Sequence, residues 1–363
     1  MRIFSFLLLL VVLGLASLAV ALSHNSPCRS ASPSAVRQPM KAAIYRCYGS
    51  ADVVRIEGIE RPVPSDHGVL VRVRASSINP LDWHFMHGEP YLMRAGSGWG
   101  APTDPSMGTD FAGTVEVVGK LVTRFKPGDE VFGTSHAAFA QYLRTPANAV
   151  VALKPANISF EQAAAAPVAG ISALQALRDH GQLRAGQKVL INGAGGGVGT
   201  FAVQIAKAMG AEVTAVTNAG SLELVRSLGA DHVIDYTRQD FTLGTTRYDL
   251  ILDMSGNHPL SAYRRVMTPT GIYVLAGDTS KGPWTGPLAG FGKAFIVSKF
   301  VDQKLVPFMA ETNAADLAIL AAMLQTGKVK PVIDRQFQLE QIADAIRYQE
   351  TGHARGKVVV TME

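Results

Sequence analysis

A glycine-rich turn between a short apolar strand and an apolar-faced helix constrains the fold of this chain more than any other feature. The segment Lys188–Asn192 has the length and apolar content of a buried strand, and the turn after it is dominated by glycine up to Gly199. Apolar residues then recur at helical spacing from Val198 to Met209, and Gly210 stands where such a helix would end. The pattern predicts a strand–turn–helix unit.

Strands and helices continue to alternate after this unit. A helix is expected at Leu222–Leu228, and strands at Glu212–Thr217, Val233–Asp235, Asp249–Asp253 and Ile272–Leu275. This alternation predicts an α/β fold with a doubly wound parallel sheet.

The segments on either side of the alternating region have a different pattern. From Met40 to about residue 160, short apolar runs are interrupted by glycine and proline, which predicts a β-rich domain. A helical stretch, Glu161–His180, follows it, and a helix over Ala314–Leu324 precedes a β-like tail. We therefore expect a targeting segment and linker over 1–39, a β-rich domain over 40–164, an inserted doubly wound domain over 165–312, and a return to the first domain over 313–363, with a cleft between the two domains.

The turn fits a dinucleotide-binding loop. Ala194, Gly196 and Gly199 take the three fingerprint positions, where small residues allow a tight turn, close approach of a pyrophosphate, and packing of helix on strand. The helix N-terminus would present N–H groups and partial positive charge to the phosphates. The residues expected to bind the cofactor are Ala194, Gly195, Gly196, Gly197, Val198 and Gly199.

The end of the second strand bears on the choice between NAD and NADP. An Asp or Glu is expected there when NAD is preferred, but this chain has Asn218 within Thr217–Ser221. No adjacent arginine is present to bind a 2′-phosphate, and the nearest, Arg226, belongs to the predicted helix. NADP (as NADPH) is favoured, and NAD stays open.

Composition excludes several classes of protein. The net charge is +5, but Arg2, Arg29 and Arg37 lie in a stretch without Asp or Glu, which leaves 31 Lys+Arg against 29 Asp+Glu elsewhere. No basic cluster interleaved with aromatics occurs, so we expect no nucleic-acid partner. Because Cys28 and Cys47 are the only cysteines, we expect neither a disulfide framework nor a cysteine-based zinc site.

The N-terminus allows several interpretations. Ile3–Leu22 is an uncharged apolar run, and Ala19–Ala21 fits a signal-peptide cleavage site, so entry into the secretory pathway is the leading one. The run is also long enough to anchor the chain in a membrane. Ser23–Pro39 is rich in Ser and Pro and free of acids, which is typical of a linker or of the second half of a bipartite plastid signal. A start at Met40 would make the protein cytoplasmic.

Taken with these motifs, the chain resembles the medium-chain dehydrogenase/reductase superfamily. The glycine loop with Gly186-Gln187, Leu190, Gln204 and Lys207 resembles the quinone oxidoreductase (zeta-crystallin) signature, and further matching segments are Val71–Asp82, Gly108–Gly113, Phe125–Gly133, Gly229–Tyr236 and Gly356–Val359. The resemblance extends over nearly all of residues 40–363. It implies a GroES-like β-rich catalytic domain, an inserted Rossmann domain, and a homodimer.

The resemblance also implies a zinc-independent reductase. Zinc alcohol dehydrogenases of this superfamily carry a Cys near Ile78–Pro80 and a Gly-His-Glu where this chain has Gly108-Thr109-Asp110, so we expect no metal. Quinones and α,β-unsaturated carbonyls accept a hydride without a Lewis acid, because their negative charge delocalises onto oxygen. The expected function is NAD(P)H-dependent reduction of such a substrate. The alternatives are an enoyl-thioester reductase, for which no clear basic patch is seen, and a non-catalytic nucleotide-binding protein.

The resemblance assigns the remaining site residues. An Asn and an Asp that line the substrate cleft of zinc-free relatives correspond to Asn79 and Asp82, and His84 stands in place of a nearby tyrosine. A histidine can donate a proton near neutral pH. Each residue also has a structural interpretation: Asn79 as the cap of a turn, and His84 as a surface residue. For the cofactor, the resemblance adds Tyr236 near the adenosine 2′ position, Ser172 near the nicotinamide, and Gly277 and Lys357. Asn218 is expected at the cofactor from its place after the second strand, where relatives often have a Ser-Thr-Arg run.

Overall fold

The structure is a computed structural model that describes residues 13–14, 16–30, 36–277, 282–284, 286 and 288–362. The first half of the apolar run, which the signal-peptide and membrane-anchor interpretations need, lies outside the described residues. Residues 16–23 are helical. Among the described residues, no helix combines the length and the apolar content needed to cross a bilayer.

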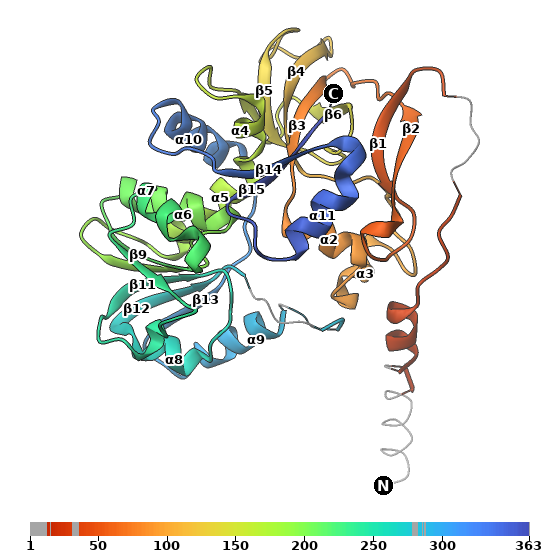
Figure 1. Ribbon diagram of the computed structural model, residues 1–363. Coiled ribbons are helices and arrows are strands. Elements are labelled where there is room, and N and C mark those ends of the chain that lie inside the picture. Colours follow the sequence, from red (N-terminus) through yellow and green to blue (C-terminus); the bar gives the residue numbers. More distant parts are fainter. Residues whose placement is uncertain are drawn as a thin grey trace.

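Two sheets organise the chain, and Figure 1 shows them as separate bodies with α5 and β15 between them. The first has seven strands in the order β14-β15-β3-β4-β5-β7, with β6 paired to β3. Its strands are β3 (Gly68–Ser77), β4 (Asp110–Val118), β5 (Glu130–Thr134), β6 (Tyr142–Pro146), β7 (Val151–Leu153), β14 (Ile333–Gln338) and β15 (Lys357–Thr361). A hairpin of β1 (Pro39–Tyr45) and β2 (Val54–Glu60) attaches to it through a bridge between Ala42 and Ala140. This is the expected β-rich unit, closed by the C-terminal return.

The second sheet has six parallel strands in the order β10-β9-β8-β11-β12-β13. They are β8 (Lys188–Asn192), β9 (Glu212–Thr217), β10 (His232–Asp235), β11 (Tyr248–Asp253), β12 (Met267–Leu275) and β13 (Lys304–Pro307). The helices that connect and cover them are α6 (Gly197–Ala208), α7 (Leu222–Ser227), α8 (Leu260–Arg265) and α9 (Leu288–Val297). The strand order reverses at β8, and ligands of doubly wound sheets bind at the carboxyl ends of the strands at such a point. The predicted doubly wound sheet is therefore confirmed.

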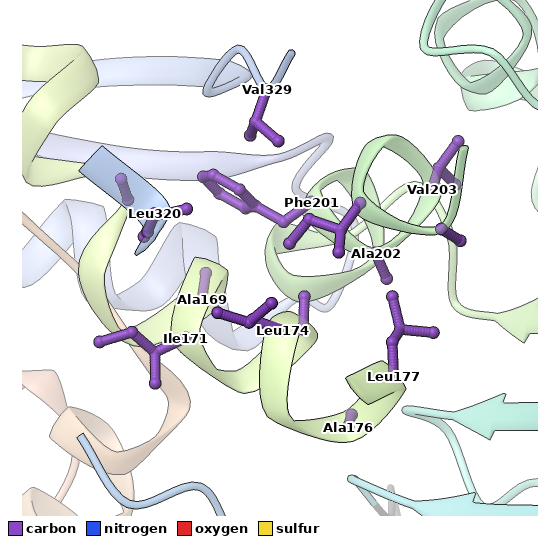
Figure 2. Close-up of a cluster of buried hydrophobic side chains, with 14 of the residues drawn as sticks. Ala169, Ile171, Leu174, Ala176, Leu177, Phe201, Ala202, Val203, Leu320 and Val329 are labelled. Carbon is purple, nitrogen blue, oxygen red and sulfur yellow. The ribbon is translucent and has the colours of Figure 1, made fainter. Parts of the chain in front are cut away.

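A continuous apolar core joins the two sheets. Figure 2 shows α5 (Pro167–Gln175) and the π-helical turn after it packed on α6, with Phe201 of α6 lying between Leu320 of α10 (Ala314–Gln325) and Val329. All of these side chains are almost fully buried. The glycine loop at the start of α6 is therefore held by close packing.

Several elements differ from the sequence expectation, among them β13, for which no strand was expected. The helix expected over Glu161–His180 is divided into α4 (Phe160–Ala164) and α5. Pro167 has no N–H to donate inside a helix and its ring clashes with the preceding turn, so it begins α5 instead. The helix α11 (Ile342–Glu350) was not expected. The short helices α2 (Pro80–His87) and α3 (Arg94–Ser97) interrupt the β-rich unit.

Part of the segment expected to be a linker packs on the β-rich domain. Arg94 is buried and donates hydrogen bonds to the carbonyls of Leu22 (2.9 Å) and His24 (3.1 Å). Ser26 N–H donates to Gly100 O (2.8 Å), and Cys28 forms a disulfide with Cys47. We call Leu22–Cys28 the N-terminal strap. The two cysteines are too few for a disulfide framework, but they form one bridge, and Ser23–Cys28 of the expected linker packs on the folded domain.

Candidate functional site

The glycine loop has the close contacts that require glycine. A Cβ on Gly199 would lie 2.2 Å from the Gly193 carbonyl oxygen, and Gly193 itself has a φ of +88°. These two glycines let the loop fold against the start of α6. A Cβ on Gly196 would meet only that same oxygen, at 3.5 Å, so the surface above Gly196 is open. The loop therefore leaves room for a phosphate next to the N–H groups that begin α6.

The end of β9 lies against this loop. A Cβ on Gly195 would come within 2.6 Å of the Thr217 hydroxyl, and Tyr236 N–H donates to Thr217 O at 3.1 Å. Asn218 follows directly as the cap of a single 3-10 turn, and half of the Tyr236 surface is exposed. The structure thus brings Asn218 and Tyr236 together beside the loop, where the adenosine ribose of a dinucleotide would lie.

A buried carboxylate holds the neighbouring strand ends, and the sequence analysis missed it. Asp253, at the end of β11, accepts hydrogen bonds from Asn192 Nδ2 (2.9 Å), the Tyr273 hydroxyl (2.7 Å) and the Ser255 N–H (2.9 Å). Gly277 lies against the same turn, where a Cβ would meet Met254 O at 2.6 Å. These contacts hold together the strand ends from which the glycine loop begins, and the small size of Gly277 allows the turn after β11 to pack against it.

The C-terminal segment of the chain joins the glycine loop. Gly356 N–H donates to Gly195 O (2.9 Å), and the side-chain stem of Lys357 lies over Gly197. The Lys357 ammonium, however, points into the β-rich domain, where it donates to Asn79 Oδ1 (2.6 Å) and Ile78 O (2.8 Å). Lys357 thus links the loop to Asn79.

Asn79 belongs to a buried polar cluster with Asp82, Asp110 and Lys357. Asn79 Nδ2 donates to Asp110 Oδ2 (2.9 Å), and Lys357 Nζ lies 3.7 Å from the same oxygen. The Asn79 backbone N–H donates to Asp82 Oδ2 (2.7 Å), which caps the start of α2. Asp110 also accepts from the Ser77 hydroxyl and from the Val168 N–H of α5. The cluster therefore ties together the β3–α2 turn, β4, α5 and β15.

Burial shifts the proton affinities of this cluster. Burial raises the pKa of Asp82 to about 7, with the nearby Asp110 adding to it and the Asn79 N–H and Lys357 opposing it. Burial also raises the pKa of Asp110, and the Lys357 ammonium opposes this shift. Burial lowers the pKa of Lys357, and the carboxylates of Asp110 and Asp82 oppose that shift. The pKa of Asp82 therefore lies near neutral pH.

His84 is placed differently. Its Nδ1 lies 2.9 Å from the Glu89 carbonyl, which can only accept, so Nδ1 carries the proton in the neutral ring. Burial lowers the pKa of His84, which favours that neutral ring. Nε2 is then an acceptor rather than a donor.

Ser172 lies one turn beyond the contact between α5 and Asp110. Its hydroxyl donates to Val168 O at 2.7 Å within the helix. Asp110, whose role the sequence analysis missed, is fully buried. An acid at the first position of a strand, directly before the apolar pair Phe111-Ala112, is the signal that could have identified it. Among the described residues, no group of three or more His, Cys, Asp or Glu is arranged to hold a metal ion.

Comparisons with known proteins agree with this architecture. A family model described as an alcohol dehydrogenase GroES-like domain matches residues 65–155, and one described as a zinc-binding dehydrogenase matches residues 228–360. The chain is 34% identical over 355 residues to a 2-methylene-furan-3-one reductase of Solanum lycopersicum, covering 94% of this chain and 84% of that protein.

A second relative and a solved structure are similar to this chain over most of its length. The chain is 33% identical over 344 residues to a chloroplastic NADPH-dependent alkenal/one oxidoreductase of Arabidopsis thaliana, covering 90% of this chain and 80% of that one. The solved structure of a quinone oxidoreductase from Coxiella burnetii superimposes with a TM-score of 0.79 at 28% identity, covering 90% of this chain and all of that one. The chain therefore belongs to the quinone oxidoreductase and alkenal/one reductase family of the medium-chain dehydrogenase/reductase superfamily.

Proposed function

We propose that this protein is an NAD(P)H-dependent reductase that transfers a hydride to a quinone or an α,β-unsaturated carbonyl. The observation that carries the proposal is the direct link between the dinucleotide loop and the buried polar cluster. Gly356 is hydrogen-bonded to Gly195, and the next residue, Lys357, is hydrogen-bonded to Asn79. One short segment thus sets the distance between the cofactor loop and the groups that would face a substrate. Two of the relatives above are named for reduction of furanones and alkenals or enones, which supports this substrate class.

The proposed site has one group of residues that binds the cofactor and one residue that donates a proton. Bound NAD(P)H supplies the hydride, and the glycine loop, Asn218, Tyr236, Ser172 and Gly277 are the proposed cofactor contacts. Reduction of an enone also takes up one proton. Asp82 is the proposed donor, because its carboxyl keeps a proton to about pH 7 whereas neutral His84 has its proton directed at Glu89. Asn79 and Lys357 are proposed to hold the site in place.

A substrate panel tests the proposal. NADPH oxidation is followed with the purified protein and a quinone, a long-chain enone or an enoyl-CoA. We expect turnover with the enone or the quinone. Turnover with the enoyl-CoA alone would favour the enoyl-thioester alternative, and cofactor binding without turnover on any of the three would favour a non-catalytic protein.

We further propose that the cofactor is NADPH and that no zinc takes part. The lack of a carboxylate in Thr217–Ser221 supports NADPH, because no anion there repels a 2′-phosphate. Asn79 and Thr109, which stand in the segments where zinc dehydrogenases have ligands, are poor zinc ligands, and the Lys357 ammonium already occupies one side of Asn79.

We also propose an organelle as the site of action. The Arabidopsis relative is chloroplastic, and the acid-free N-terminal segment of this chain has the composition of a targeting sequence. A homodimer is proposed from the family resemblance. Membrane association through the N-terminal apolar run is proposed from its composition alone.

A further inference from the structure

The loop that follows β9 has a cation that does not come from its own part of the sequence. Between Thr217 and Ser221 the chain has no charged side chain. Arg355, from the far end of the chain, donates from Nη1 to the Gly220 carbonyl oxygen at 3.3 Å. The structure therefore places a guanidinium beside the loop in which a dinucleotide's adenosine ribose would lie.

The backbone of Arg355 is fixed relative to the glycine loop. The next residue, Gly356, is bridged to Gly196 and hydrogen-bonded to Gly195. Gly356 has a φ of +94°, and a Cβ there would lie 2.4 Å from Val332 O, so only glycine allows this approach. Arg355 N–H is held by Asp334 Oδ2 at 3.0 Å. The side chain thus starts from a fixed point beside the glycine loop.

The guanidinium has capacity for a further anion. The Arg355 side chain is 57% exposed, and its Nε forms an ion pair with Asp334 Oδ1 at 3.9 Å, a distance too long for a hydrogen bond. Its one side-chain hydrogen bond among the described residues goes to a neutral carbonyl. An arginine has five N–H donors in a planar fork that matches a phosphate. Most of these donors are therefore available.

The other charged groups near this loop are engaged elsewhere. Arg226 pairs with Glu223 on α7, and Lys357 is buried in the polar cluster. The Asp235 carboxylate accepts from the hydroxyl and N–H of Thr237. Arg238 lies on the turn after β10 and is the alternative cation that an experiment must separate from Arg355.

We propose that Arg355 determines cofactor specificity by pairing its guanidinium with the adenosine 2′-phosphate of NADPH. The inference rests on the proposed use of a nicotinamide cofactor and adds the residue that distinguishes its two forms. In this arrangement the neutral Asn218 loop permits the phosphate, Tyr236 lies beside it, and the C-terminal segment supplies the charge. Lys357 lies two residues after Arg355, so the residue that would select the cofactor and the cation of the polar cluster belong to the same short segment.

Binding of two adenosine fragments tests this without catalysis. Calorimetry compares 2′,5′-ADP with 5′-ADP on the wild type, Arg355→Gln and Arg355→Lys. We expect Arg355→Gln to weaken 2′,5′-ADP by about tenfold, the loss typical of one charge-assisted hydrogen bond, and to change 5′-ADP by less than about threefold. Arg355→Lys should retain most of the affinity for 2′,5′-ADP, and added salt should reduce the wild-type preference.

Two further variants serve as controls. Arg335→Gln removes the same charge from β14, where the guanidinium stacks on Tyr348 at 4.0 Å, and should bind both fragments as the wild type does. The proposal is overturned if Arg355→Gln binds 2′,5′-ADP normally, if it loses both fragments equally, or if Arg238→Gln shows the selective loss instead. Equal binding of the two fragments by the wild type would also overturn it.

The same variants, assayed for turnover, separate this proposal from the proposed function. With an active substrate, Arg355→Gln should raise the KM for NADPH about tenfold and leave the KM for NADH unchanged. A wild type that reduces no substrate but keeps the selective fragment binding would contradict the reductase and support Arg355 as the 2′-phosphate ligand. A wild type that reduces a substrate, together with an Arg355→Gln variant that binds both fragments as the wild type does, would support the reductase and contradict the role of Arg355.

Discussion

At the scale of single residues, the Asn79 amide is engaged within the protein. Its Oδ1 accepts from Lys357, and its Nδ2 donates to Asp110. A side chain held in this way positions its neighbours and has little freedom to donate to a substrate. Burial raises the pKa of Asp82 to about 7, which makes this carboxyl the natural focus of a pH experiment.

Asp82→Asn should remove the pH dependence of the chemical step. If protonated Asp82 supplies the proton, kcat of the wild type falls as pH rises through about 7. The asparagine keeps an acceptor for the Asn79 N–H but has no acidic proton, so we expect kcat to drop by about 100-fold and the inflection to disappear. A pH profile of kcat at saturating substrate measures both. An inflection that survives in the variant would assign the proton to another group.

The same substitution makes a prediction for stability that is independent of activity. Because the pKa of Asp82 is higher in the folded protein than in an unfolded chain, the folded state retains a proton that the unfolded state releases between about pH 4 and 7. The free energy of unfolding therefore falls as pH rises through this window. Denaturant unfolding at pH 5 and pH 8 should show a smaller difference in Asp82→Asn than in the wild type.

Lys357→Met tests the buried ion pair. The substitution keeps an apolar stem of similar length but leaves the fully buried Asp110 without its cation. We expect a loss of about 3–5 kcal/mol in the free energy of unfolding. Adding Asp110→Asn removes the unpaired charge and should recover part of that loss. Denaturant unfolding of the two single variants and the double variant forms the cycle, and strictly additive losses would show that the two side chains are not coupled.

The candidate site residues named from the sequence stay predictions, and the contacts that join them across the fold were not predicted. Asn79 and Asp82 are three residues apart and could be found together from one segment. The sequence offered a signal for Asp110 but not for its partners, and Arg355 gave none, because their contacts depend on where β4 and the segment before β15 meet other parts of the chain. No arginine stands next to Asn218 in the sequence, and the fold brings Arg355 to this loop from the C-terminal segment.

At the scale of elements, the N-terminal strap is the least expected feature. Its Ser- and Pro-rich composition predicts a linker, yet its backbone carbonyls satisfy the buried Arg94, whose guanidinium also stacks on Tyr48 at 4.4 Å. Composition alone does not show this, because the strap contributes backbone groups and one cysteine rather than apolar side chains. Five of the six strands of the parallel sheet, in contrast, were found from their apolar runs, which need no distant partner to be recognised, and β13 was missed.

Shortening the chain tests the strap. A variant that begins at Met40 loses the partners of Arg94 and the disulfide, and we expect its Tm to be about 5 °C below that of a variant that begins at Leu22. Arg94→Met in the longer chain should reproduce part of the difference. Thermal unfolding of the three proteins measures these differences in Tm. Equal melting temperatures for the Met40 and Leu22 variants would show that the strap is not part of the folded domain.

At the scale of the whole molecule, the two sheets are joined by the chain segment that also builds the site. β15 pairs with β3 in one sheet, and the residue before it is bonded to the glycine loop of the other. Helix α5 adds a second connection through the Val168 N–H and Asp110. The proposed hydride transfer therefore depends on a fixed relation between the two halves of the molecule.

The most direct test of the account follows the hydride itself. The protein is incubated with an enone and NADPH that carries deuterium at the transferable position of the nicotinamide, and the product is analysed by mass spectrometry and NMR. The account predicts a saturated ketone with one deuterium on the β-carbon and a solvent-derived proton on the α-carbon. Deuterium on the carbonyl carbon of an alcohol, or a product without deuterium, would contradict it.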